Sequence, residues 1–179
     1  DLFAVLLGGA TALLPIYAHD ILHTGPWGLG LLRASPALGA LTMSIWLAYR
    51  PLGQPVGKRL LAALLVFGGA TMLFGLSTWL PLSMVALYIL GMSDVVSVVI
   101  RFSLVQLQTP DDMLGRVSAV NSLFVGTSNQ LGEFESGSMA ALLGVVPAVL
   151  IGGVGTIAVS LIWMFWLFPE LRRLKTLEG

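Results

Sequence analysis

The sequence predicts an all-helical membrane protein with six transmembrane helices. Of its 179 residues, 56% are apolar and only 10% are charged, and the mean hydropathy is +0.92. A soluble domain carries roughly 25% charged residues, so this composition does not fit a freely soluble protein. Apolar runs of about 20 residues, the length that a helix needs to cross a bilayer, recur along the whole chain.

Charged or turn-forming segments separate the six apolar runs. The runs cover residues 2–18, 28–49, 60–77, 80–105, 117–143 and 146–168. They indicate one six-helix membrane domain over residues 1–179, with a cytoplasmic tail at 169–179. The first run follows no basic segment and does not resemble a signal peptide, so we expect the chain to be a fragment of a longer protein. In the segment before the fifth run, Thr109 is expected to cap the helix, with Pro110 in its first turn.

The basic residues predict the orientation in the membrane. If all six runs cross, the loops at 19–27, 78–81 and 144–147 contain no Lys or Arg. The opposite side then holds Arg50, Lys58, Arg59, Arg116, Arg172, Arg173 and Lys175. The positive-inside rule makes that side cytoplasmic and places both ends of the chain there. The fifth run is the most polar, but omitting it would move the basic tail outside, so we expect it to cross.

Several function classes lack support in the sequence. Nine basic and nine acidic side chains cancel, so no basic surface is available for nucleic acid. Without cysteine, a disulfide framework and a thiolate metal site are excluded. No nucleotide-binding or nucleophile motif occurs in a suitable context, so neither an enzyme nor a cofactor is predicted. His19 and His23 are spaced like metal ligands, but we expect an exposed helix end there and no metal.

The fourth run contains two charges on one helical face. Asp94 lies near the middle of the run, and Arg101 follows two turns later toward the cytoplasm. Charged groups at this depth are costly and usually functional, so Asp94 is a candidate proton or cation site. The alternative is a structural Asp94–Arg101 pair that fixes the helix to a neighbour. Arg33, in the outer half of the second run, could contact an anionic substrate, pair with Asp94 or Glu133, or extend to the lipid headgroups.

The fifth run carries a stripe of small and polar side chains at spacings of three and four. Its members are Ser118, Ser122, Gly126, Asn129, Glu133, Ser136 and Ala140. Such a stripe favours an aqueous path, with Glu133 as a second protonatable group. Asn129 and Gln130 are candidate cavity contacts or interhelical hydrogen-bond partners. Glu135 lies on another face than Glu133, so one can face the cavity while the other pairs across an interface. Gly8, Gly68 and Gly152 are expected to be helix-packing points.

The loops and the polar helices resemble a known family. Four segments carry this resemblance: the short basic loop ending in Gly57, Lys58 and Arg59, the stretch at 109–122 with Gly115 and Arg116, and the segments at 91–101 and 129–137. They are similar to the carboxyl-terminal half of major facilitator superfamily transporters, in the drug and siderophore exporter branch. The superfamily's loop signature would place a glycine at Arg50 and an aspartate at Gln54, so only its last three positions match. The resemblance implies helices seven to twelve of a twelve-helix fold in a bacterial inner membrane.

Two functional hypotheses follow. The first is half of a proton-coupled exporter that moves a small organic or siderophore-like compound by alternating access. Its expected partners are the lipid bilayer, the substrate, protons and the amino-terminal six-helix half. The second is a membrane scaffold or sensor without transport, whose intramembrane charges are structural pairs.

Overall fold

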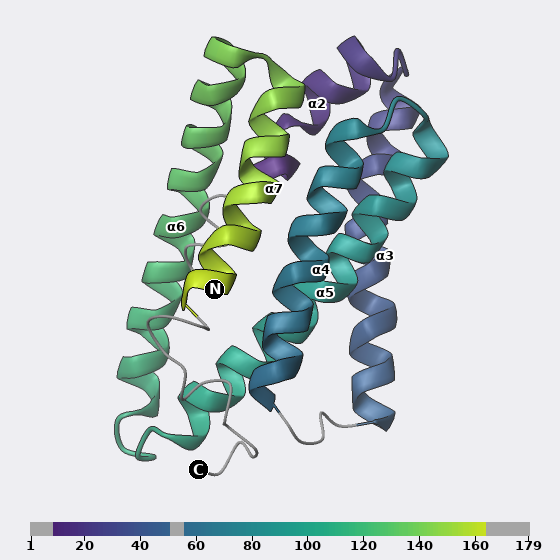
Figure 1. The fold of residues 1–179 in the computed structure, drawn as a ribbon. Coiled ribbons are helices and arrows are strands. Elements are labelled where there is room, and N and C mark those ends of the chain that lie inside the picture. The colour runs from purple at the N-terminus through teal and green to yellow at the C-terminus, as the bar shows by residue number, and fades with distance from the viewer. Residues whose placement is uncertain (1–8, 51–55, 164–179) are drawn as a thin grey trace.

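The computed structural model describes residues 9–50 and 56–163, and this part of the chain is helical with no strand. Five long helices follow a short irregular segment: α3 (Pro26–Tyr49), α4 (Val56–Leu76), α5 (Leu80–Leu107), α6 (Leu114–Leu143) and α7 (Val145–Ile162). They run alternately up and down, so consecutive helices are joined at opposite ends of the bundle (Figure 1). The predicted all-helical class is therefore confirmed for the described residues.

The first predicted span is the least regular. Residues 1–8 lie outside the described residues. The rest consists of a 3-10 turn η1 (Gly9–Leu13), a single α-turn α2 (Leu14–Ile16) and a π-turn η2 (Tyr17–Ile21). Pro15 sits inside this segment and supplies no backbone N–H, which favours a local change of helical geometry.

Four of the helices can cross a membrane by length and composition. They are α3, α4, α5 and α7. Helix α6 has 30 residues but does not qualify, since it is the most polar of the five. Four of the six predicted membrane crossings thus correspond to helices that are long and apolar enough to cross. That α6 and the first segment also cross stays a prediction.

The predicted start at Thr109 of the helix that contains the fifth apolar run is wrong by several residues. Helix α6 begins at Leu114, and residues 110–113 form turns before it. Thr109 does not cap α6; its hydroxyl donates instead to the carbonyl oxygen of Val105, at the end of α5 (2.5 Å). A threonine hydroxyl can bond either forward to a helix start or back to the preceding turn, and here the longer α5 provides the acceptor.

Glycines allow close contact between two pairs of helices. A Cβ on Gly39 would overlap the Tyr88 carbonyl, and one on Gly91 would overlap the Pro36 carbonyl, so α3 and α5 are in backbone contact. Between α4 and α7, a Cβ on Gly68 would lie 3.0 Å from the Gly153 carbonyl oxygen. The packing role expected of Gly68 is therefore confirmed. Gly152 is buried, and Gly8 lies outside the described residues.

Tyr17 anchors the irregular first segment to the bundle. Its side chain is fully buried, and its ring centroid lies 4.3 Å from that of Phe74. Its hydroxyl lies 2.8 Å, 3.0 Å and 2.8 Å from the carbonyl oxygens of Phe74, Gly75 and Ser77. The Phe74 and Gly75 carbonyls belong to the last turn of α4, where helical acceptors lack partners within the helix, and Ser77 follows directly after α4. The contact holds η2 against the turn that joins α4 to α5.

Candidate functional site

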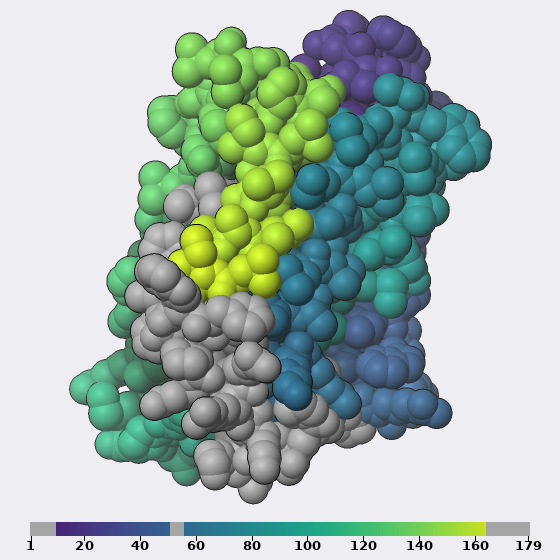
Figure 2. Space-filling view, viewed as in Figure 1, coloured from purple at the N-terminus to yellow at the C-terminus, as the bar shows by residue number. Residues whose placement is uncertain are grey.

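Helices α5 and α6 contact each other only slightly. Helix α5 packs between α3 and α4, whereas α6 packs on α7 and η1 (Figure 1). Figure 2 shows α6, α7 and α4 side by side on one face of the molecule. The separation of α5 from α6 creates a cavity of about 450 Å³ between them. It is lined by Thr11, Pro36, Ala37, Ala40, Phe67, Leu90, Gly91, Asp94, Val98, Arg101, Val125, Asn129 and Glu133.

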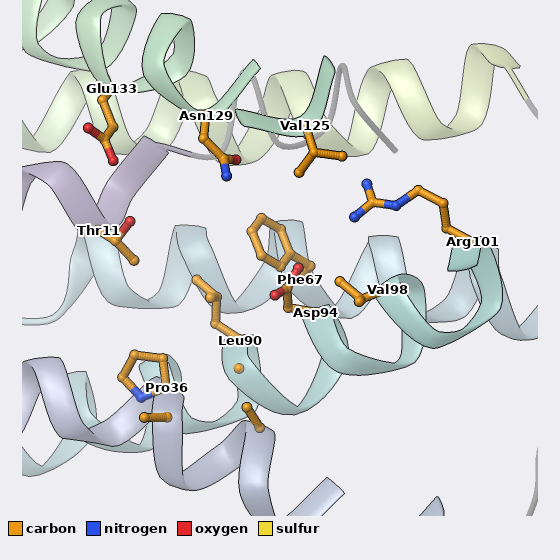
Figure 3. A pocket seen from close by; sticks show the side chains of 13 residues that line it. Thr11, Pro36, Phe67, Leu90, Asp94, Val98, Arg101, Val125, Asn129 and Glu133 are labelled. Atoms are coloured by element: carbon orange, nitrogen blue, oxygen red, sulfur yellow. The ribbon is translucent and has the colours of Figure 1, made fainter. Parts of the chain in front are cut away.

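The cavity brings together four polar residues that the sequence singled out. Asp94 and Arg101 face it from α5, and Asn129 and Glu133 face it from α6 (Figure 3). Asp94 and Asn129 lie near the midpoints of their helices, so these polar groups are about as far as possible from either end of the bundle. The remaining lining is mostly apolar, which makes the few polar side chains the groups able to orient a ligand.

The cavity is lined by side chains of both charges, Asp94 and Glu133 as acids and Arg101 as a base. The opposite charges of Asp94 and Arg101 attract each other, and both side chains are half-buried. In Figure 3 the Arg101 guanidinium lies toward one end of the cavity, whereas Glu133 and Thr11 lie toward the other end. Asn129 and Glu133 are exposed, so the α6 wall forms part of the open rim. The site can therefore bind a cation or proton at its carboxylates and an anionic group at Arg101.

The other predicted residues lie outside the cavity lining. Arg33, Gln130 and Ser122 are exposed, and Ser136 is buried with 7% of its surface accessible. Glu135 is half-buried, and in the described part of the chain it forms no ion pair; its Oε2 atom is buried without a hydrogen-bond partner. Among the described residues no ion pair of Glu135 is seen, and a structural pairing of Glu135 stays a prediction. The stripe on α6 is not one continuous cavity wall, because only part of it faces α5.

The basic loop residues gather at one end of the bundle. Gly57, Lys58 and Arg59 open α4, and Gly115 and Arg116 open α6. Gly57 is buried, Lys58 and Arg116 are exposed, and both helices begin at the end where α3 and α5 terminate (Figure 1). This grouping agrees with the charge asymmetry seen in the sequence. The tail with Arg172, Arg173 and Lys175 lies outside the described residues.

Sequence reasoning missed the residues that complete the cavity. Thr11, Phe67 and Val125 line it, and nothing in their local sequence separates them from the apolar runs around them.

The histidine pair of the first segment lies at the end of the bundle away from the basic loop residues. His19 donates or accepts a 2.6 Å hydrogen bond with Asp20, depending on its tautomer. No group of three or more His, Cys, Asp or Glu side chains that could hold a metal occurs within residues 9–50 and 56–163.

Comparison with known proteins finds relatives that are named as exporters. No family model matches this chain. The chain is 31% identical over 155 residues to the enterobactin exporter of Citrobacter koseri, a match that covers 86% of this chain and 36% of that protein. It is 29% identical over 178 residues to the enterobactin exporter of Shigella flexneri, covering 95% and 43% respectively. The Escherichia coli O1:K1 enterobactin exporter is 30% identical over 141 residues.

The chain therefore spans about two fifths or less of the length of the curated relatives it matches. Similarity at this level extends over most of the chain, across the helices that form the cavity. It confirms the resemblance drawn from the polar helices and the basic loop. This chain is a homologue of the siderophore exporters of the major facilitator superfamily.

Proposed function

We propose that this chain is one six-helix half of an exporter and that the cavity between α5 and α6 is its share of the transport path. The observation that carries the proposal is the placement of Asp94, Arg101, Asn129 and Glu133 around a single cavity inside an apolar bundle. Exposing such groups to hydrocarbon is costly, whereas a water-filled path solvates them. The exporter homologues give this cavity its functional context.

The proposed cargo is a small organic compound of the siderophore type, as the printed name of the relatives suggests. Its polar groups would bind at Arg101 and Asn129, and its apolar parts would lie against Phe67 and Leu90. Binding in a cavity of this kind depends on a few oriented polar contacts within an apolar lining.

Asp94 and Glu133 are the proposed proton-coupling groups. Each can hold a negative charge or a proton, and they face the cavity from two helices that touch only slightly. Protonation of Asp94 would weaken its attraction for Arg101 and free the guanidinium for an anionic group of the cargo. Alternating access would then couple inward proton flow to outward cargo movement.

The proposed membrane arrangement follows the charge distribution. The domain over residues 1–179 crosses the bacterial inner membrane six times, with the first segment and α6 included and both ends in the cytoplasm. Helix α6 is tolerated because its polar side faces the cavity and not lipid. By the resemblance, the unit that completes the path is the amino-terminal half of the longer relatives.

Efflux measurements test the coupling. In inverted membrane vesicles that contain the intact protein, a siderophore such as enterobactin should accumulate when a proton gradient is imposed. Asp94→Asn and Glu133→Gln should each reduce this accumulation several-fold, whereas Asp20→Asn, which changes an exposed carboxylate outside the cavity, should leave it unchanged. Full accumulation in both cavity variants would remove the coupling assignment.

A scaffold or sensor without transport is the second candidate, and the attraction between Asp94 and Arg101 favours it. For this function, neutralising both charges should restore the stability that either single change removes. Transport by the unmodified protein would exclude a purely structural role.

A further inference from the structure

The ionisable side chains of the cavity carry an unbalanced negative charge. Those among the described lining residues are two acids and one base: Asp94, Glu133 and Arg101. Asp94 and Arg101 attract each other on the same helix, so their charges offset one another. Glu133 forms no ion pair with any residue in the ranges 9–50 and 56–163. The charge that a ligand has to balance therefore lies at Glu133.

The acid at Glu133 and the base at Arg101 lie toward opposite ends of the cavity (Figure 3). Asp94 and Asn129 lie at about the same depth, near the midpoints of α5 and α6. Arg101 follows Asp94 by seven residues on α5. Because α6 runs the opposite way, Glu133, four residues after Asn129, lies on the other side of that depth. The helical rise puts the two backbones roughly 16 Å apart along the bundle, and the long Arg101 side chain shortens the gap between the charged groups to about 10 Å.

The wall between these two ends is mostly apolar. Phe67, Leu90 and Val125 line it, and Asn129 contributes a neutral amide. Such a wall favours an aromatic or hydrocarbon body, while the few polar groups decide which ligand binds and how it is oriented. At each end, a group of opposite charge gains a charge-assisted hydrogen bond, and a group of like charge is rejected. The cavity therefore discriminates by the charge at each end of a ligand.

We infer that the cavity prefers a dipolar cargo, which places a basic nitrogen at Glu133 and an anionic group at Arg101, about 10 Å apart. The inference rests on the proposed function and narrows its cargo by charge. Asp94 and the cargo can share Arg101, because a guanidinium has five N–H donors. A compound without the basic nitrogen can still bind at Arg101, but less tightly. Glu133 is thus the specificity-determining residue, and the nitrogen of the bound cargo faces away from the basic loops.

Binding of three linear probes of equal length tests the preference. The probes are ω-aminooctanoate, ω-hydroxyoctanoate and octanedioate. All three offer a carboxylate to Arg101 and differ only in the group that meets Glu133. Radiolabelled probes are equilibrated by dialysis against the purified intact protein in detergent at neutral pH. We expect the amino acid to bind several-fold more tightly than the hydroxy acid, and the dicarboxylate to bind least tightly of the three.

Variants of α6 assign the preference to one side chain. Glu133→Gln should abolish the difference between the amino and the hydroxy acid, and Glu133→Lys should make the dicarboxylate the tightest ligand. The matched control is Glu135→Gln, which neutralises a carboxylate of the same helix outside the cavity lining and should keep the original order. Circular dichroism first establishes that each variant keeps the helical content of the unmodified protein.

Two results overturn the inference. One is equal binding of the three probes by the unmodified protein. The other is an amine preference that survives Glu133→Gln but is lost in Asp94→Asn, which would move the cation to the other carboxylate. The readout does not depend on transport. A protein that ranks the probes as expected but exports none of them would count against the proposed function alone, and efflux without any amine preference would count against this inference alone.

Discussion

Removing the Tyr17 hydroxyl should destabilise the protein, and Tyr17→Phe isolates that group because the ring and its contact with Phe74 remain. The hydroxyl is fully buried and lies within 3.0 Å of three carbonyl oxygens. It has a single hydrogen to share, so the loss is that of one strong or divided hydrogen bond plus the cost of carbonyls left without a donor. Ser77 already donates its backbone N–H to the Phe74 carbonyl oxygen, which leaves Gly75 and Ser77 as the acceptors most affected.

The expected loss is about 1 to 3 kcal/mol, the range measured when a buried polar group loses its partner. Unfolding is followed in detergent by helical circular dichroism against temperature or denaturing detergent. The matched control is Tyr49→Phe, which removes the hydroxyl of a tyrosine that is 84% exposed at the carboxyl end of α3. If Tyr17→Phe and Tyr49→Phe differ by less than about 0.5 kcal/mol, the anchor described above does not hold the first segment.

Two further predictions concern the helices that form the cavity. Gly91→Ala should lower the free energy of unfolding by about 1 to 3 kcal/mol, because its Cβ would overlap the backbone carbonyl of Pro36. The control Gly69→Ala should be neutral or stabilising, since its Cβ meets no atom within 4 Å. Equal thermal stability of the two variants would contradict the close α3–α5 contact. Asp94→Asn and Arg101→Gln should each lower stability, and the double variant should recover part of the loss, because a buried charge without its partner is less favourable than two neutral side chains. Additive losses in the double-mutant cycle would show that the two charges do not interact.

Patterns along the chain predicted the long helices better than their ends. The apolar runs at 28–49 and 80–105 correspond to Pro26–Tyr49 and Leu80–Leu107, because twenty apolar residues flanked by proline and polar turns leave few alternatives to a helix. The start at Thr109 could not be fixed in the same way, since its hydroxyl has acceptors on either side and the length of α5 decides between them. The irregular geometry at Tyr17 arises from contacts with the distant α4–α5 turn, which no local pattern contains.

The site shows the same division between local and distant causes. Periodicity placed Asn129 and Glu133 on one face of a helix, and spacing placed Asp94 and Arg101 on one face of another. Periodicity alone left open whether the two faces meet, and it did not identify Thr11 or Phe67, which complete the lining. It also grouped Ser122 and Ser136 with the cavity residues, although Ser136 is buried and Ser122 is exposed outside it. Burial depends on which neighbours a helix has.

The weak contact between α5 and α6 links the architecture to the proposed exporter. Helix α5 is locked to α3 at Gly39 and Gly91, where backbone meets backbone and little sliding is possible. Helix α6 instead packs on η1 and α7, so the two sets of polar side chains are connected mainly through other helices and not by direct packing of α5 on α6. A shift of α6 with η1 relative to α3 and α5 would change the distance between Glu133 and Asp94 without breaking either close contact. In the proposed exporter, a ligand that spans both groups would bias such a shift, since it favours the arrangement in which they are close.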